Sequence, residues 1–115
     1  MNFVNLTNHP SIMWSEKQLA ESMRYGDIVD LPFPVVDPKL SKNEVHELAE
    51  EYLARINELD PAIVLVQGEM TLTFQLVQML KDKGIKVVAA CTERQTEDYS
   101  DGKITVFEFA GYREY

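Results

Sequence analysis

The chain has 115 residues, 45% of them hydrophobic, which is ordinary for one domain, spanning residues 1–115, with a modest core. Its formal net charge of −8 argues against broad, sequence-independent binding to extended nucleic acid, because such binding needs a basic surface. The single cysteine, Cys91, leaves no internal disulfide, and without an apolar run of roughly 18 residues or a signal peptide we expect a cytoplasmic protein with no membrane contact.

The N-terminal part predicts a strand, a helix and a second strand. Phe3–Leu6 is a short apolar strand, and it ends before Pro10, which cannot donate to a strand ladder. Ser15 begins a helix with a capping box, and Gly26 is its natural stop. Asp27–Leu31 follows as the second strand, and a proline-rich segment ends it.

The middle of the chain has the strongest helix pattern. Ser41 and Glu44 form a capping box, and apolar residues then recur every three to four positions as far as Leu59. The continuous apolar run Ala62–Val66 is typical of a central strand that helices cover on both faces. A third helix is predicted from about Thr71 to Lys83.

The C-terminal part predicts two more strands. Ile85–Ala90 is the fourth, and Lys103–Phe109 alternates as a strand with one exposed face. The polar stretch Thr92–Gly102 is predicted as a loop of about ten residues without a helix, so the last strand should run antiparallel at an edge. The expected fold is a single Rossmann-like α/β domain. Its sheet of about five strands should be mostly parallel, with helices on both faces and the first and third strands adjacent.

Three polar segments should meet at the carboxyl edge of this sheet. They follow the first, third and fourth strands, and this edge is where ligands collect in open α/β sheets. The hinge at Gly68 opens a helix whose first N–H groups favour anionic oxygen. The residues expected at this edge are Thr7, Asn8, His9, Ser11, Gln67, Glu69, Thr71, Thr73, Thr92, Glu93 and Arg94.

Several of these side chains have two interpretations. His9 is either a proton carrier or ligand contact, or a turn histidine before proline. Glu69 is a general base or a stabiliser of the helix N-terminus, and Thr71 is its N-cap or a ligand contact. The hydroxyl of Thr73 is a candidate to face the ligand. Arg94 either clamps a phosphate or pairs with a neighbouring glutamate.

The sequence predicts no metal and no cofactor. Two separated histidines and one cysteine do not form a zinc set. No phosphate-binding loop with its lysine and no dinucleotide-binding glycine pattern is present. A ligand at this edge would therefore be held mainly by backbone and hydroxyl groups.

Four segments give the chain a family resemblance. It resembles small stand-alone CRISPR-associated proteins of the CARF (CRISPR-associated Rossmann fold) and ring nuclease group. The segments are Asn5–Ser11 with Trp14 and Gln18, Gln67–Phe74, Ala90–Arg94 and Tyr112–Tyr115.

The resemblance implies a homodimer that binds a cyclic oligoadenylate, the second messenger of type III CRISPR defence. Some members of the group cleave the ring without a metal, by attack of a ribose 2′-OH on the adjacent phosphate. Matching positions would make His9 the acid or base and Arg94 the charge stabiliser. The cradle for the ligand would comprise Thr7, Asn8, Gly68, Glu69, Thr71 and Thr73. A sensor without turnover, and an adaptor that uses the acidic second helix, remain alternatives.

Overall fold

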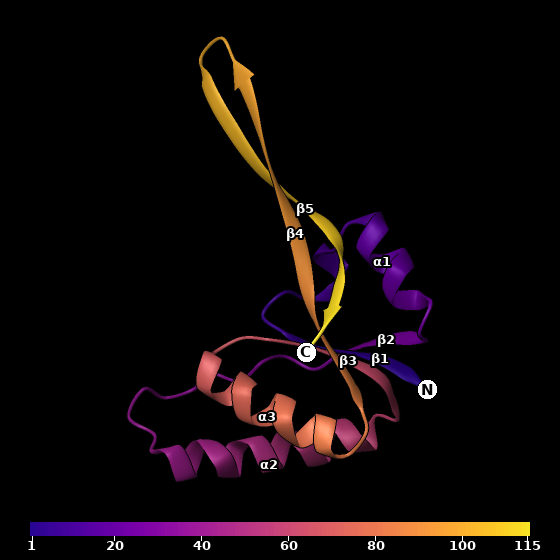
Figure 1. Ribbon diagram of the computed structural model, residues 1–115, viewed down its shortest axis with the longest axis vertical. Coiled ribbons are helices and arrows are strands. Elements are labelled where there is room, and N and C mark those ends of the chain that lie inside the picture. Colours follow the sequence, from indigo (N-terminus) through magenta and orange to yellow (C-terminus); the bar gives the residue numbers. More distant parts are fainter.

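The computed structural model describes residues 1–115 and contains one five-stranded sheet with three α-helices (Figure 1). The strands are β1 (Asn2–Thr7), β2 (Asp27–Asp30), β3 (Pro61–Gln67), β4 (Lys86–Tyr99) and β5 (Gly102–Glu114). The α-helices are α1 (Glu16–Met23), α2 (Lys42–Glu58) and α3 (Met70–Asp82), and a short 3₁₀ helix spans Ser11–Met13. Every predicted strand and helix is present, although β4 and β5 are much longer than expected.

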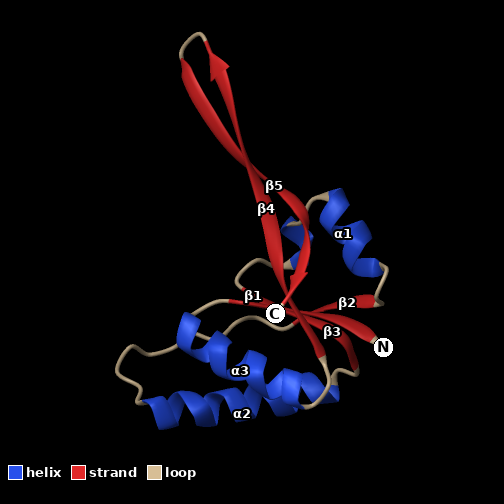
Figure 2. Cartoon of the chain, in the orientation of Figure 1, coloured by secondary structure: helices blue, strands red, loops and turns tan.

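The strands lie in the order β2-β1-β3-β4-β5. The pairs β1–β2, β1–β3 and β3–β4 are parallel, whereas β5 runs antiparallel to β4 at the edge. The predicted adjacency of the first and third strands, the central third strand and the antiparallel edge strand are therefore confirmed. Helix α1 covers one face, and α2 and α3 cover the other, as expected (Figure 2).

Alternating side chains of β3 divide the core between the two faces. Val64 and Val66 pack towards α2 and α3, whereas Ile63 and Leu65 pack towards the α1 side. All four are at most 2% exposed, which explains why this strand is a continuous apolar run. On the α1 side the cover includes the partly buried rings of Trp14, Tyr25 and Tyr112.

Helix α2 forms as its sequence predicts. The Ser41 side chain accepts from the Glu44 backbone N–H while the Glu44 carboxylate accepts from that of Ser41, so the capping box is complete. Its buried stripe is Val45, Ala49, Tyr52 and Ile56. None of the helices in the structure is long and apolar enough to cross a membrane.

The predicted loop at Thr92–Gly102 is wrong, because this stretch belongs to a long β-hairpin. Strand β4 pairs with β3 only as far as Val88, but it continues to Tyr99 with β5 as its sole neighbour. A two-residue turn, Ser100–Asp101, joins the strands, and the following Gly102 has a φ of 144° that favours glycine. We call residues 92–109 the arm, which projects from the body of the molecule (Figure 1).

The arm explains both the incorrect loop prediction and the nature of the sheet. Almost every residue of the arm is exposed, so its strands need no apolar face, and the polar sequence of its β4 half is typical of a loop. The β4–β5 ladder has twelve paired positions, against thirteen in the three parallel ladders together. The sheet is therefore mixed, not mostly parallel as predicted.

Candidate functional site

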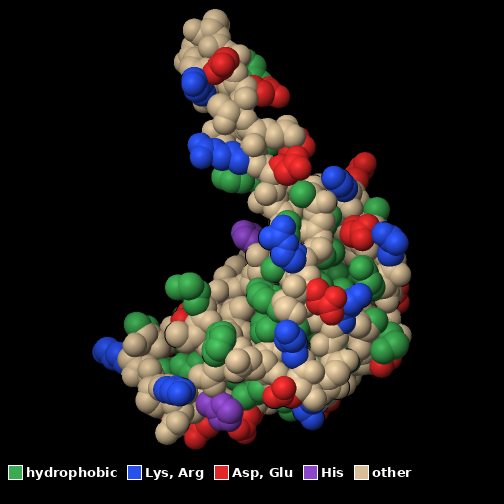
Figure 3. Space-filling model, in the orientation of Figure 1, with side chains coloured by type: hydrophobic (Ala, Val, Ile, Leu, Met, Phe, Trp, Pro, Cys, Tyr) green, Lys and Arg blue, Asp and Glu red, His purple; other side chains and the backbone are tan.

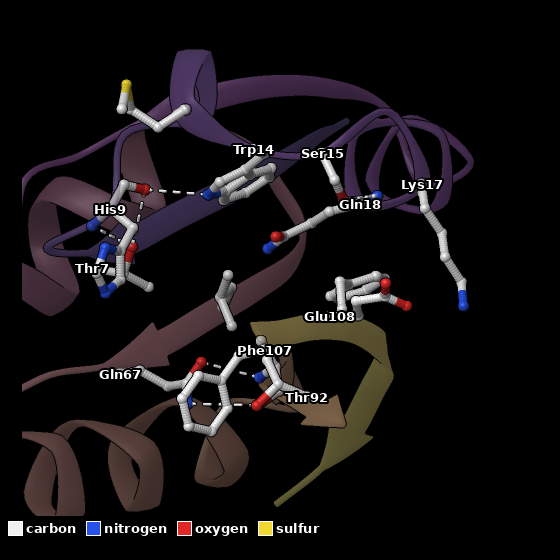
Figure 4. A pocket seen from close by; sticks show the side chains of 14 residues that line it. Thr7, His9, Trp14, Ser15, Lys17, Gln18, Gln67, Thr92, Phe107 and Glu108 are labelled. Atoms are coloured by element: carbon white, nitrogen blue, oxygen red, sulfur yellow. Dashed lines mark hydrogen bonds between the residues drawn. The ribbon is translucent and has the colours of Figure 1, made fainter. Parts of the chain in front are cut away.

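A cleft of about 670 Å³ opens where β1 and β3 end, between α1 and the base of the arm (Figure 4). Four residues predicted at this edge line it, namely Thr7, His9, Gln67 and Thr92. Figure 4 shows Trp14 and Gln18 on one side, with Phe107 and Thr92 across from them. The remaining lining residues are Met13, Ser15, Lys17, Leu65, Ala90, Glu108 and Phe109. We call this hollow the cleft.

A buried polar network fixes the turn after β1. Asn5, only 2% exposed, donates through Nδ2 to the His9 carbonyl (2.9 Å) and to Asp30 Oδ1 (2.9 Å). The Thr7 hydroxyl donates to Asn5 Oδ1 (2.8 Å) and accepts from the His9 backbone N–H (3.1 Å). Trp14 Nε1 also donates to the His9 carbonyl (3.1 Å). The turn is therefore held by the fold itself, while the His9 ring makes no hydrogen bond and lies at the cleft.

Ser11 and Asn8 lie outside the cleft. The Ser11 hydroxyl donates to Asp30 Oδ2 (2.8 Å), and its backbone N–H donates to the same carboxylate. Asn8 is exposed and borders a separate hollow of about 190 Å³, together with Asn5 and Asp30. Ser11 thus serves to tie the chain after β1 to the end of β2.

Gln67 extends the sheet with its side chain. Its Oε1 accepts from the Ala90 N–H (2.9 Å), and its Nε2 lies 3.5 Å from the Ala90 carbonyl, so the amide bridges β3 and β4 beyond their backbone ladder. Both the oxygen and the nitrogen of this amide therefore contact the backbone of Ala90, so the Gln67 side chain lines the cleft in a fixed position.

The N-cap of α3 is Glu69, not Thr71 as one prediction had it. The Glu69 carboxylate accepts from the Thr71 N–H (3.0 Å), the Leu72 N–H (2.9 Å) and the Thr71 hydroxyl (2.7 Å). These backbone hydrogen bonds, first that of Thr71 and then that of Leu72, lower the pKa of Glu69 below its ordinary 4.5. A carboxylate held ionised by its own helix is a poor proton acceptor, which agrees with its interpretation as a helix stabiliser.

Gly68 is explained by packing. A Cβ at this position would lie 2.5 Å from Cδ2, Cε2 and Cζ of Phe33, whose ring is 7% exposed. The chain after β2 passes directly beneath this turn, since the Phe33 N–H donates to the Thr7 carbonyl (3.3 Å). Any side chain other than hydrogen would therefore collide with the core.

Thr73 borders a second hollow on the α3 side of the sheet edge. This groove, of about 520 Å³, also contains Gly68, Phe74 and Tyr115, and Gln67 separates it from the cleft. The Thr73 hydroxyl oxygen is buried without a hydrogen-bond partner. The predicted edge is thus divided between two hollows, and Thr73 does not share one with His9.

Arg94 lies on the arm, outside the cleft. The ladder places it opposite Phe107 and two positions beyond Thr92, so all three side chains belong to the same face of the ribbon. Arg94 forms no ion pair with Glu93 or Glu97, the alternative that the sequence left open. Its guanidinium has no ion-pair partner, and Phe107, which lies opposite it in the ladder, lines the cleft.

The polar groups that remain free at the cleft are fewer than the sequence predicts. The His9 ring, the Thr92 hydroxyl and the Lys17 ammonium have no hydrogen-bond or ion-pair partner within the chain. No group of three or more His, Cys, Asp or Glu side chains is arranged to hold a metal ion. A ligand would therefore meet these three free groups together with the Ser15 hydroxyl, the Gln18 amide, the Glu108 carboxylate and three aromatic rings.

The sequence interpretation missed the aromatic part of the cleft. From the sequence, Trp14 is singled out only as part of the family resemblance, and Phe107 and Phe109 are predicted only to lie on an edge strand. Their spacing of two residues does place both phenylalanines on one face. Without the hairpin, however, nothing in the pattern indicated that this face meets α1.

The fold and the cleft define an α/β protein with a polar and aromatic cleft at the carboxyl edge of a mixed sheet. The model of the family described as Uncharacterized protein MJ1673 family matches residues 1–113, so the chain belongs to this family. The match includes every residue of the cleft and the whole arm. Comparisons with curated proteins and with solved structures gave no match.

Proposed function

We propose that the chain is a Rossmann-like, CARF-type protein that binds a cyclic oligoadenylate in the cleft as a homodimer, and opens the ring without a metal. The supporting observation is the cleft itself, which combines aromatic rings with free hydrogen-bonding groups at the sheet edge where β1 and β3 end. This is the position at which open α/β sheets bind ligands.

The lining fits a nucleotide better than it fits a simple anion. The rings of Trp14, Phe107 and Phe109 offer faces on which bases stack, a contact that every base can make. Lys17 supplies a charge for a phosphate, and the Thr92 hydroxyl supplies a donor and an acceptor for a ribose or a base edge.

The size of the cleft supports a homodimer. Pockets for ligands of drug size measure about 300–1,000 Å³, so a cleft of about 670 Å³ suits one or two nucleotides. A ring of four or six nucleotides needs more room. A two-fold axis would supply a second identical cleft and would double the few positive groups that face the phosphates.

The chemistry assigned to the cleft is transesterification within the ligand. A ribose 2′-oxygen forms a bond to the adjacent phosphorus while the bond from phosphorus to the 5′-oxygen breaks. His9 takes the proton from the 2′-OH and returns one to the 5′-oxygen, and Arg94 stabilises the charge on the phosphoryl oxygens. The product is a linear chain that ends in a 2′,3′-cyclic phosphate.

One observation favours binding without turnover as the second candidate. The His9 ring has no partner that orients it, and Arg94 lies on the arm beyond the cleft. Catalytic groups are usually held in place by neighbours. A sensor or sequestering module would not need this positioning.

The test is incubation of the pure protein with cyclic tetra-adenylate and cyclic hexa-adenylate in EDTA. Linear products with a 2′,3′-cyclic phosphate support the nuclease, and retention of the intact ring supports the sensor. If neither ring is bound or cleaved, the proposal is wrong and an adaptor acting through the acidic outer face of α2 becomes the better account.

Variants then test the assigned roles. His9→Ala should slow cleavage about 100-fold or more, because general acid–base groups typically contribute 10²–10⁴. His46→Ala is the matched control, since this second histidine lies on α2, away from the cleft. Arg94→Ala should also slow cleavage, and unchanged rates in both His9→Ala and Arg94→Ala would exclude the assigned roles.

A further inference from the structure

The two faces of the arm differ in chemistry. Pairing in the β4–β5 ladder places Thr92 opposite Phe109 and Arg94 opposite Phe107, so these four residues share one face, which we call the inner face. Thr92, Phe107 and Phe109 line the cleft. The inner face is therefore continuous with the cleft and extends outward from it.

The outer face is acidic and aliphatic. The ladder places Glu93 and Glu97 on it, together with Val106 and Ile104. Glu108 belongs to the same row, and its carboxylate accepts from Gln95 Nε2 (3.2 Å) even though it also borders the cleft.

The inner face, in contrast, holds both basic residues of the arm. These are Arg94 and Lys103, and the only acid in the inner row is Asp98, which lies 3.8 Å from the Lys103 ammonium. Figure 3 shows the arm standing clear of the body, with charged side chains along it and a hollow where it leaves the body.

Phe107 is unusual for a phenylalanine. Its side chain is 66% exposed, whereas Phe109, two residues further along the same face, is 8% exposed and packs against Tyr112 with ring centroids 5.0 Å apart. Phe107 thus contributes little to the core. An exposed ring beside a free guanidinium matches the elements with which proteins bind single-stranded nucleotides, namely a stacking surface next to a cation.

We propose that the inner face of the arm is a second subsite for the ligand, in which Phe107 stacks on a base and Arg94 contacts the phosphate next to it. The inference rests on the proposed nucleotide-binding function. The cleft alone holds the first nucleotide, and the inner face holds the nucleotide linked to it. Affinity therefore depends on the number of linked nucleotides, and Arg94 contributes only when two or more are present.

The single tryptophan gives a direct measurement, because Trp14 lines the cleft. Titrations of the full chain followed by Trp14 fluorescence would compare AMP, linear tri-adenylate and cyclic tetra-adenylate. Because Phe107 also lines the cleft, the test is the difference between ligands: Phe107→Ala should weaken binding of both longer ligands about tenfold more than it weakens binding of AMP. Val106→Ala is the matched control, since it removes an exposed aliphatic side chain from the outer face at the next position.

The salt dependence tests the phosphate contact separately. Arg94→Gln should lower the slope of log affinity against log salt concentration by about 0.7 for tri-adenylate, the value for one lost phosphate contact on a single strand. The slope for AMP should not change.

Each outcome is decisive. Tri-adenylate binding that is equal in the unaltered chain, Phe107→Ala and Val106→Ala would overturn the subsite while leaving the cleft in place. An equal loss for AMP and tri-adenylate in Phe107→Ala would also overturn it, because the ring would then act within the cleft alone. Absence of binding by the unaltered chain would refute the proposed function together with the subsite.

Discussion

Gly68 lies in the turn between β3 and α3, and a double-mutant cycle with Phe33 tests whether packing against that ring requires glycine there. An added Cβ would lie 2.5 Å from three carbons of the Phe33 ring, whereas ordinary contacts begin near 3.4 Å. The ring must therefore move by about 1 Å within a core where it is 7% exposed. Overpacking of this kind costs about 1–3 kcal/mol.

Gly68→Ala also has a smaller, stabilising effect, which acts through the unfolded chain. Alanine restricts the unfolded chain more than glycine does, and where the backbone tolerates it this stabilises by about 0.4–1 kcal/mol. The φ of Gly68 is not positive, so the backbone tolerates alanine. Gly68→Ala should thus destabilise the natural chain by about 1–2 kcal/mol. In a Phe33→Leu background, which removes part of the ring, it should be neutral or slightly stabilising.

Urea unfolding of the four proteins measures the cycle. The coupling free energy between the two sites should be about 1–3 kcal/mol, and each kcal/mol should move the thermal midpoint by about 4 °C. An equal loss from Gly68→Ala in both backgrounds would refute the collision and return Gly68 to the candidates for ligand contact.

Two predictions concern pH. Glu69 has a folded-state pKa below 4.5, so its cap stabilises the protein above that pH and the contribution is lost as the pH falls through the folded pKa. Glu69→Gln should lower the free energy of unfolding by about 0.5–1 kcal/mol at pH 7 and by less at pH 3. Glu47→Gln, on the exposed face of α2, is the control and should leave the free energy of unfolding nearly unchanged. A loss in Glu69→Gln that is the same at both pH values would contradict the prediction. Burial raises the pKa of Tyr112 above 10, and the hydrogen bond with Ser22 (2.6 Å) opposes this with a smaller effect. The folded state therefore holds the phenol proton more tightly than the unfolded state does, so the free energy of unfolding should fall as the pH rises above 10. The urea midpoint of the unaltered chain should therefore fall between pH 9 and pH 11, and Tyr112→Phe should make this fall smaller. Tyr25→Phe is the control. If the urea midpoint falls as steeply in Tyr112→Phe as in Tyr25→Phe, Tyr112 is not the source of the fall.

The parts of the fold that bury an apolar face were predictable. Helix α2 has a stripe at helical spacing and a capping box, and β3 is apolar throughout because helices cover both its faces. The arm was not predictable in this way. Its residues 92–109 face solvent on both sides for most of their length, so hydrophobic alternation, the main sequence signal for a strand, is weak in β4.

The candidate site was predictable in position but not in composition. Thr7, His9, Gln67 and Thr92 meet at the carboxyl edge as the parallel topology requires. The sequence could not show that Thr73 faces the opposite side of this edge, since that depends on the rotation of α3 about its axis. It also could not show the inner face of the arm, because the polar stretch Thr92–Gly102 is typical of a loop and this face forms only when β4 pairs with β5.

The hydrogen bonds of the edge limit what the cleft can do chemically. Thr7 and Gln67 are engaged by Asn5 and Ala90, so neither can turn towards a ligand without breaking a contact of the fold. What remains is a rigid floor with three aromatic rings and few free polar groups, one of which is the His9 ring. Such a surface binds a ligand more through its shape and through stacking on the rings than through charge. Under the proposed function, the free cations for a ligand's phosphates are then Lys17 at the cleft and Arg94 on the arm. The proposed turnover therefore depends on the arm as well as on the floor, because Arg94 is the residue that the proposed mechanism assigns to charge stabilisation.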